Sequence, residues 1–198
     1  MSTARPRLAL TGETAADRLL EDNPFALVVG MLLDQQISME LAFLGPWRLE
    51  QRLGAPLTPA AIAALDVDAL TEHFRERPAL HRYPGSMAAR VHALATALVE
   101  EHGGDAAALW EGAADGADLK RRLTALPGFG DQKARILIAL LGKRLGVRPS
   151  GWREAAGDYG LDGFRSIADV TGPDALAKVR ETKQAAKRTA EQRAERGG

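Results

Sequence analysis

The sequence predicts an all-α fold, and two observations lead to this prediction. Apolar residues recur at helical spacing along most of the chain, and no segment shows the sustained alternation of apolar and polar residues that marks a strand. Hydrophobic residues make up 45% of the 198 residues, which is enough for one sizeable core. We therefore expect residues 1–198 to form a single unit of packed helices.

Capping residues mark the first helices. Asn23 and Pro24 have the types favoured at an N-cap and at the first helical position, and they precede an apolar helix that we expect to end in glutamines. Ser38 is expected to cap the next helix, which Gly45-Pro46 should interrupt and Gly54 should end. Thr58-Pro59 predicts the start of a short alanine-rich helix.

The middle of the chain predicts two further helices before a turn. Ser86 is expected to cap a helix with Met87, Val91, Leu94 and Leu98 on its inner face, and Gly103-Gly104 should end it. Another helix is expected through Leu119 and Leu123.

The last part of the chain begins with the most apolar predicted helix. Residues 131–145 include the run Ile136–Leu141, which is apolar nearly all round and therefore predicts a buried central helix. Residues 146–172 are rich in loop-forming types. Pro173 should open a final amphipathic helix that frays near Gly197-Gly198.

Charge is distributed unevenly, although Lys and Arg balance Asp and Glu over the whole chain. Residues 1–119 carry nine basic and 17 acidic residues, whereas residues 120–153 carry nine basic residues and one acidic residue. Such a block is typical of a local phosphate-binding face, and the alternative is that these charges only solvate a helical surface.

The basic block surrounds a short turn, Leu126-Pro127-Gly128-Phe129-Gly130. Proline and glycine end one helix and start another there, and the bare amides at a helix start attract anions such as a DNA phosphate. An ordinary turn between two helices is the alternative. Cationic side chains on both sides favour the phosphate interpretation: Lys120, Arg121, Arg122, Lys133 and Arg135.

Three segments resemble the HhH-GPD superfamily, the helix-hairpin-helix DNA glycosylases related to endonuclease III and the alkyladenine glycosylases. They are the hairpin LPGFGDQKA, the segment VVGMLLDQQISMELA and the stretch from His81 to Trp110, and their order and spacing also agree with the family. The resemblance covers roughly residues 23–146. It implies a two-lobed helix-hairpin-helix fold, duplex DNA as the partner, and hydrolysis of the N-glycosidic bond of an extruded base.

The resemblance also implies roles for individual residues. The hairpin around Gly128, Phe129 and Gly130 would hold a phosphate, in some relatives with K⁺ or Na⁺ at its carbonyls. Gln35 and Gln36 would enter the duplex beside the extruded base. The alternative for these glutamines is that their amides cap the carbonyls at a helix C-terminus.

The lysine that forms a Schiff base in bifunctional relatives is replaced by Gln132. Lys133 follows it, about 100° further round the helix, so we expect its side chain to point toward the phosphate backbone or solvent, and the alternative is that Lys133 is itself the nucleophile. The resemblance therefore implies a monofunctional hydrolase that borohydride does not trap on DNA.

The catalytic aspartate of the family is not found where it is expected. The matching window, Arg148-Pro149-Ser150-Gly151-Trp152-Arg153-Glu154, contains no aspartate. Glu154, Asp158 and Asp34 are the candidate replacements, although Glu154 equally suits a solvated helix start and Asp34 an exposed helix end. Trp152 suits stacking on a base or packing in the core.

The sequence predicts neither an iron–sulfur cluster nor a targeting signal. The absence of cysteine excludes a cysteine-ligated iron–sulfur cluster, and the four histidines lack a recognisable metal-ligand spacing. We expect no cofactor apart from the monovalent cation, no membrane span and no leader. A monomer in the cytoplasm, associated with the nucleoid if the source is bacterial, is the expected state.

Three functions remain open from the sequence. A monofunctional DNA N-glycosylase acting on damaged or mispaired bases is the first, and a non-catalytic binder of DNA structure or lesions is the second. The third is a protein-interaction module whose basic segment docks an acidic partner. A carboxylate that faces the hairpin would favour the glycosylase over the non-catalytic binder. Competition by duplex DNA for the basic segment would distinguish both of them from the protein-interaction module.

Overall fold

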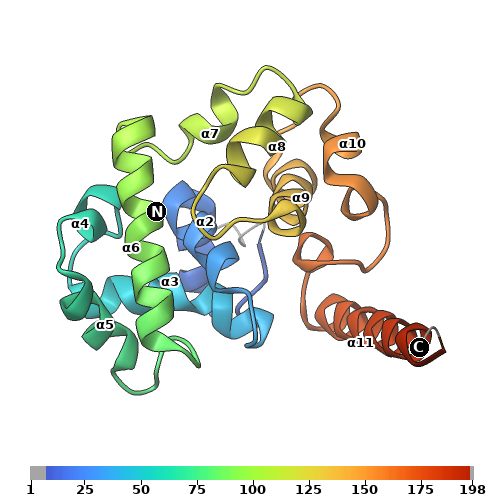
Figure 1. Ribbon diagram of the computed structural model, residues 1–198, viewed down its shortest axis with the longest axis horizontal. Coiled ribbons are helices and arrows are strands. Elements are labelled where there is room, and N and C mark those ends of the chain that lie inside the picture. Colours follow the sequence, from blue (N-terminus) through green and yellow to red (C-terminus); the bar gives the residue numbers. More distant parts are fainter. Residues whose placement is uncertain (1–7, 197–198) are drawn as a thin grey trace.

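The computed structural model describes residues 8–196, apart from the side chains of residues 190 and 193–196, and this part of the chain contains helices and no strand. The predicted all-α fold is confirmed (Figure 1). The α-helices are α1 (Thr14–Asp22), α2 (Pro24–Leu33), α3 (Met39–Leu53), α4 (Pro59–Ala63), α5 (Val67–Arg75), α6 (Pro84–His102), α7 (Ala108–Glu111), α8 (Gly116–Thr124), α9 (Asp131–Leu140), α10 (Trp152–Ala156) and α11 (Pro173–Arg196).

The helices form two groups joined through α2. In the first group, α1 and α2 pack on α3, and α4 and α5 pack on α6. In the second group, α8 and α10 pack on α9, which also contacts the short turns η1 (Leu141–Leu145), η2 (Gly157–Gly160) and η3 (Ile167–Asp169). Helix α2 contacts both α6 and α9, and Figure 1 shows it in the middle of the molecule. All residues of α2 after Pro24 are buried, as its apolar sequence requires.

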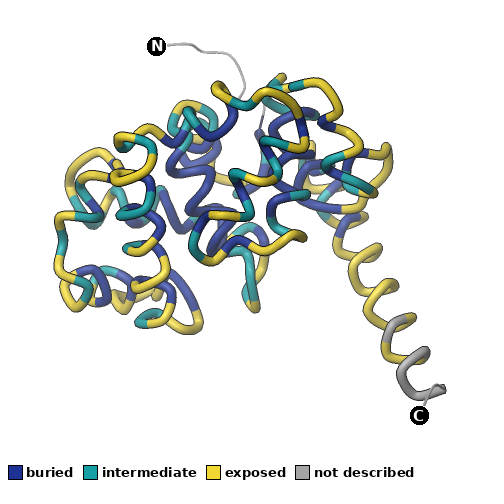
Figure 2. The backbone as a smooth tube through the Cα atoms, turned by 45° about the horizontal axis from the view of Figure 1, so that its top comes forward, coloured by how far each residue is buried: buried dark blue, intermediate teal, exposed yellow. Residues whose placement is uncertain are grey.

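The final helix lies apart from both groups over most of its length. Ala175 and Val179, near its start, are buried, whereas residues 180–189 are exposed. Figure 2 shows this helix projecting from the rest of the chain. The fraying expected near Gly197-Gly198 lies outside the described residues.

Several predicted helix ends are confirmed. The Asn23, Ser38 and Thr58 side chains each accept a hydrogen bond from a backbone N–H in the first turn of the following helix. Gly54 and Gly103 end their helices in the left-handed conformation that glycine adopts without steric cost.

Three expectations about helix ends and interruptions were wrong. Helix α2 ends at Leu33, so the glutamines lie in the turn beyond it. Pro46 is buried inside α3, which continues through it. Helix α6 begins at Pro84, before Ser86, since proline suits the first helical position. The helix expected over residues 131–145 is confirmed, as α-helix to Leu140 and as π-helix η1 from Leu141 to Leu145.

Candidate functional site

The hairpin joins α8 to α9 and packs directly against α2. Gly128 has φ +80°, and a Cβ at this position would lie 2.5 Å from Leu32 Cδ1. Only glycine therefore allows both the turn and the close approach to α2. Phe129 is 6% exposed and donates its N–H to the Leu126 carbonyl at 3.1 Å. The Phe129 side chain therefore belongs to the core, and a contact of this residue with DNA stays a prediction for its backbone.

Gly130 presents the open side of the hairpin. It is the N-cap of α9, no side chain caps it, and apart from its chain neighbours no atom lies within 4 Å of where its Cβ would be. The first amides of a ten-residue helix thus begin beside unoccupied space. This arrangement suits an anion, because the unpaired N–H groups and the helix dipole both favour negative charge.

An open cleft of about 920 Å³ lies beside the start of α9. The turn between α2 and α3, η2 and the exposed part of α11 form its other walls. Most of the side chains that line the cleft are polar, among them Asp34, Gln36, Lys133, Arg165 and Lys183.

Lys133 points into this cleft, so the expectation that it faces the phosphate backbone or solvent was wrong. Its Nζ donates hydrogen bonds to the carbonyls of Met31, at 3.0 Å, and Leu32, at 2.5 Å. These carbonyls belong to the last turn of α2, where a cation is favoured. Burial lowers the pKa of Lys133 to about 8, although the Asp34 carboxylate opposes this shift.

Asp34 is the C-cap of α2 and lies half-buried in the same cleft. Burial raises the pKa of this carboxyl above its ordinary value, and the charges of Lys183 and Lys133 counteract part of the rise. The sequence made Asp34 a candidate catalytic carboxylate, and in the fold the charges of Lys133 from α9 and Lys183 from α11 both act on it.

The two glutamines of the turn have different environments. The Gln35 amide donates to the Leu32 carbonyl at 3.4 Å and accepts from Arg90 at 3.3 Å, so local contacts hold it. Gln36 is exposed, with φ +58°, and no described residue hydrogen-bonds its side chain. Gln36 is therefore the glutamine that is free to contact a ligand.

Sequence reasoning missed His81, which holds this turn in place. Its Nε2 lies 2.9 Å from the Gln35 carbonyl, and its Nδ1 accepts the Tyr83 N–H at 3.1 Å. These two bonds require a neutral ring with the proton on Nε2. Burial lowers the pKa of His81, which also favours the neutral form. Its spacing to the other histidines carried no signal for this role.

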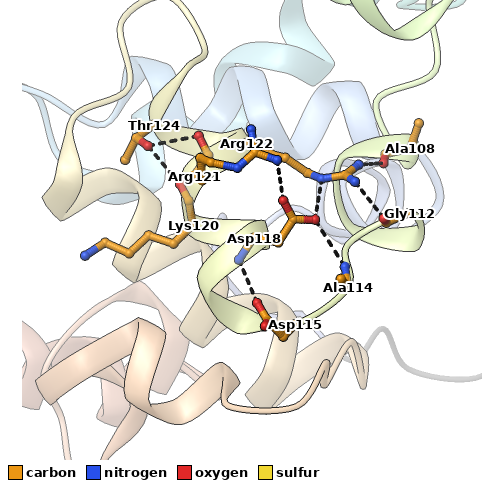
Figure 3. A network of polar contacts seen from close by, with 9 residues as sticks. All are labelled: Ala108, Gly112, Ala114, Asp115, Asp118, Lys120, Arg121, Arg122 and Thr124. Atoms are coloured by element: carbon orange, nitrogen blue, oxygen red, sulfur yellow. Dashed lines mark hydrogen bonds and ion pairs between the residues drawn. The ribbon is translucent and has the colours of Figure 1, made fainter.

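The basic block is less available to a ligand than its composition predicted. Arg122 donates to Asp118 at 2.9 Å and to the Gly112 carbonyl at 2.7 Å, and Arg121 pairs with the same carboxylate (Figure 3). The Ala114 N–H and these arginines lower the pKa of Asp118. Arg122 therefore fastens α8 to the end of α7, whereas the Arg121 side chain is 74% exposed.

Other cations of the block also have internal partners. Asp131 pairs with Lys120 at 2.6 Å and with Arg135 at 2.7 Å. Lys143 and Asp169 form a largely buried pair, also at 2.6 Å. Part of the excess positive charge thus stabilises the second group of helices.

The other predicted site residues are divided between the cleft and the surface. Asp158 lines the cleft, as does Gln132, whose amide donates to the Tyr159 hydroxyl at 2.9 Å. Glu154 is exposed on α10 and is not part of the cleft lining. Trp152 is buried against Gly142, where an added Cβ would lie 2.4 Å from its ring. It is a packing residue rather than a base-stacking one.

The described residues contain neither a candidate metal site nor a candidate membrane span. Residues 8–196 contain no group of three or more His, Asp or Glu side chains that could hold a metal ion. None of the helices in this range is long and apolar enough to cross a membrane.

Comparison with protein families gives one match, and it covers most of the chain. Residues 29–196 match the model of the HhH-GPD superfamily base excision DNA repair protein. No curated protein and no solved structure gives a significant match. The match contains the hairpin, the cleft and α11, and the chain therefore belongs to the HhH-GPD superfamily of base excision DNA repair proteins.

Proposed function

We propose that this protein is a monofunctional DNA N-glycosylase, which hydrolyses the bond between a damaged or mispaired base and its deoxyribose. The observation that supports this best is the half-buried carboxylate of Asp34, which lies in an open cleft beside the uncapped start of α9. A monomer that works at the nucleoid is part of the proposal.

The cleft offers the groups that this reaction needs. The start of α9 would hold a DNA phosphate, and the target nucleotide would rotate into the cleft, since its glycosidic bond is inaccessible within the base stack. Loss of the base leaves positive charge on the sugar, which an ionised carboxylate stabilises while it orients water. Asp34 would act in this way, and Gln36 would occupy the space left in the duplex.

Substitution of the carboxylates tests the proposal. Abasic sites are measured by alkali cleavage on a panel of lesion-containing duplexes, and Asp34→Asn should lower the rate about 100-fold or more, as loss of a transition-state contact does. Asp158→Asn and Glu154→Gln are the matched comparisons, and a larger loss in either would move the catalytic role to that residue. Binding of lesion DNA without any product would favour the non-catalytic binder.

The pH profile provides a second check on Asp34. Because burial raises its pKa and the reaction needs the ionised form, base release should increase as the pH rises through this raised pKa. The acid limb of the rate profile should therefore lie above the ordinary aspartate value of about 3.9.

A second candidate function is strand scission at abasic sites, which the position of Lys133 in the cleft supports. A neutral amine can condense with the sugar aldehyde, release water and form a Schiff base. If Lys133 acts in this way, borohydride trapping should increase as the pH approaches about 8, where the amine loses its proton. Lys133→Ala should abolish trapping and Gln132→Ala should retain it, whereas absence of trapping in the unchanged protein would exclude this function.

A monovalent cation at the hairpin carbonyls stays a prediction of the family resemblance. The Leu126 and Gly130 carbonyls already accept hydrogen bonds from Phe129 and Ala134, so a cation would share these oxygens. Replacing K⁺ or Na⁺ by a bulky organic cation at constant ionic strength should weaken DNA binding if the cation is present.

A further inference from the structure

We infer that the cleft takes a neutral base that carries carbonyl oxygens, such as a deaminated or oxidised base, and rejects a cationic alkylated purine. This inference rests on the proposed glycosylase function and specifies its substrate class. It is argued from the charges, the hydrogen-bond donors and the aromatic content of the cleft lining.

The charges that face the cleft come from every wall. Lys133 and Arg135 belong to α9, Arg165 to the segment before η3, and Lys183 to α11; the carboxylates are Asp34, Asp131 and Asp158.

Internal pairing weakens the acidic part of this set. Asp131 is engaged by Lys120 and Arg135, and Asp34 lies within the fields of two lysines. Asp158, on the surface of η2, forms no ion pair with a described residue. The lining therefore carries four cations and three carboxylates, and Lys120, which lies outside the lining, adds a further positive charge beside Asp131. A cationic base would meet net repulsion.

Two of the cations remain free to bind a ligand. Lys183 Nζ lies 3.2 Å from the uncharged Met39 sulfur and forms no ion pair within the described chain. The Arg165 side chain likewise has no hydrogen-bond partner among residues 8–196, although its backbone N–H donates to Asp169. Together with the free amide of Gln36, these side chains present donors, and carbonyl oxygens are the acceptors that match them.

Aromatic residues are scarce in the cleft. A cationic base is usually held against the electron-rich faces of aromatic rings. Within the described lining, Tyr159 is the single aromatic side chain, and its hydroxyl accepts a hydrogen bond from Gln132. The cleft therefore lacks the stack of rings that would offset repulsion of a positive charge.

Helix α11 brings Lys183 to the cleft. Ala175 and Val179 anchor the start of this helix in the core, and Arg180 pairs with Glu40 at the start of α3. Lys183 follows one turn after Val179, so these contacts fix it on the side that faces the cleft. A specificity role for α11 follows from this placement.

The first experiment compares two sets of duplexes with the full-length protein under single-turnover conditions. One set contains uracil, hypoxanthine or 8-oxoguanine, and the other contains 7-methylguanine or 3-methyladenine. The acceleration over spontaneous release should be about tenfold larger for at least one member of the first set than for the second, a difference that one charged contact can supply. Equal or larger acceleration for the cationic bases would overturn the inference and leave the proposed function intact. Release of neither class would contradict the proposed function, and the inference would fall with it.

The second experiment removes one charge from α11. Lys183→Met should lower the ratio of carbonyl-base to cationic-base release about fivefold, because the ammonium favours one class and repels the other. Lys187→Met is the control, since Lys187 lies on the same helix, is 80% exposed and does not line the cleft. A contact between Lys183 and a DNA phosphate would affect both duplexes equally, so its loss would leave this ratio unchanged. A specific role for Lys183 would be contradicted if this ratio fell equally in both variants or if it fell in neither of them.

Discussion

The two glycines of the hairpin occupy different environments, so substitution has a different consequence at each. Gly128→Ala should lower the free energy of unfolding by about 1–3 kcal/mol, the usual cost of a left-handed non-glycine residue, and contact with Leu32 adds to this loss. Gly130→Leu should change stability by less than about 0.5 kcal/mol, as at other open positions, because its φ of −98° is ordinary.

For DNA affinity we expect the opposite: the direct effect of Gly130→Leu should be larger than that of Gly128→Ala. Gly130→Leu should weaken binding about tenfold by blocking one charge-assisted hydrogen bond from the α9 amides. Urea unfolding and fluorescence anisotropy with a labelled duplex measure the two quantities. Unchanged affinity in Gly130→Leu would show that the hairpin is a turn without a phosphate site.

His81 should make stability depend on pH. Its folded pKa is lowered, so below the unfolded value of about 6.5 the unfolded chain binds more protons. The stabilising contribution is complete above that pH and decreases as the pH falls through it toward the lower folded value.

Urea unfolding from pH 7.5 to pH 5 measures this effect. The free energy of unfolding should fall more steeply in the wild type than in His81→Gln, which lacks the titrating ring. Parallel curves would mean that the ring is not held in its neutral form.

At the scale of elements, α8 carries two adjacent arginines with different roles. Arg122→Ala should destabilise the protein by about 1–2 kcal/mol, because its side chain makes hydrogen bonds that link α8 to α7. Arg121→Ala should leave stability within about 0.5 kcal/mol, since an exposed ion pair contributes little.

The same pair of variants tests DNA binding at the surface of α8. Arg121→Ala should reduce the salt dependence of duplex binding by about one phosphate contact, and Arg122→Ala should not. Thermal unfolding and binding titrations at several salt concentrations measure both outcomes. If Arg122→Ala alone changed the salt slope, its internal hydrogen bonds would have to break when DNA binds.

At the scale of the whole molecule, a neutral net charge does not prevent salt-dependent binding of DNA. Local cations set the number of phosphates contacted, and several members of the basic block are committed to internal carboxylates and carbonyls. The slope of log affinity against log salt should therefore be modest, on the order of −3 to −5 by counterion release. Salt-independent binding to duplex DNA would contradict a phosphate-binding role.

The sequence predicted features whose cause is local. Caps at Asn23, Ser38 and Thr58 depend on one side chain and the next turn of backbone, so the residue types were sufficient. The burial of Ile136–Leu141 followed from an apolar run that no solvated helix tolerates. The continuous helix through Pro46 could not be predicted in this way, because packing between helices overrides the local preference of proline.

Residues far apart in the sequence decided the candidate site. Asp34, Lys133 and Lys183 belong to three elements, and only the packing of α2, α9 and α11 brings them to one cleft. The direction of Lys133 was mispredicted for the same reason. Its position on α9 fixes the direction of its Cα–Cβ bond, but hydrogen bonds to the carbonyls of α2 determine where its Nζ lies.

The sequence by itself determined the helical class, the hairpin and the family, because these depend on periodicity and on a short motif. The tertiary structure alone decided which charges are free. The composition counts every Lys and Arg alike. In the fold, carbonyls and carboxylates of other segments pair with Arg122 and Lys143, which therefore stabilise the structure. Lys183 has no such partner among the described residues and faces the cleft. Electrostatic interactions act through space, so their partners are fixed only when the chain has folded.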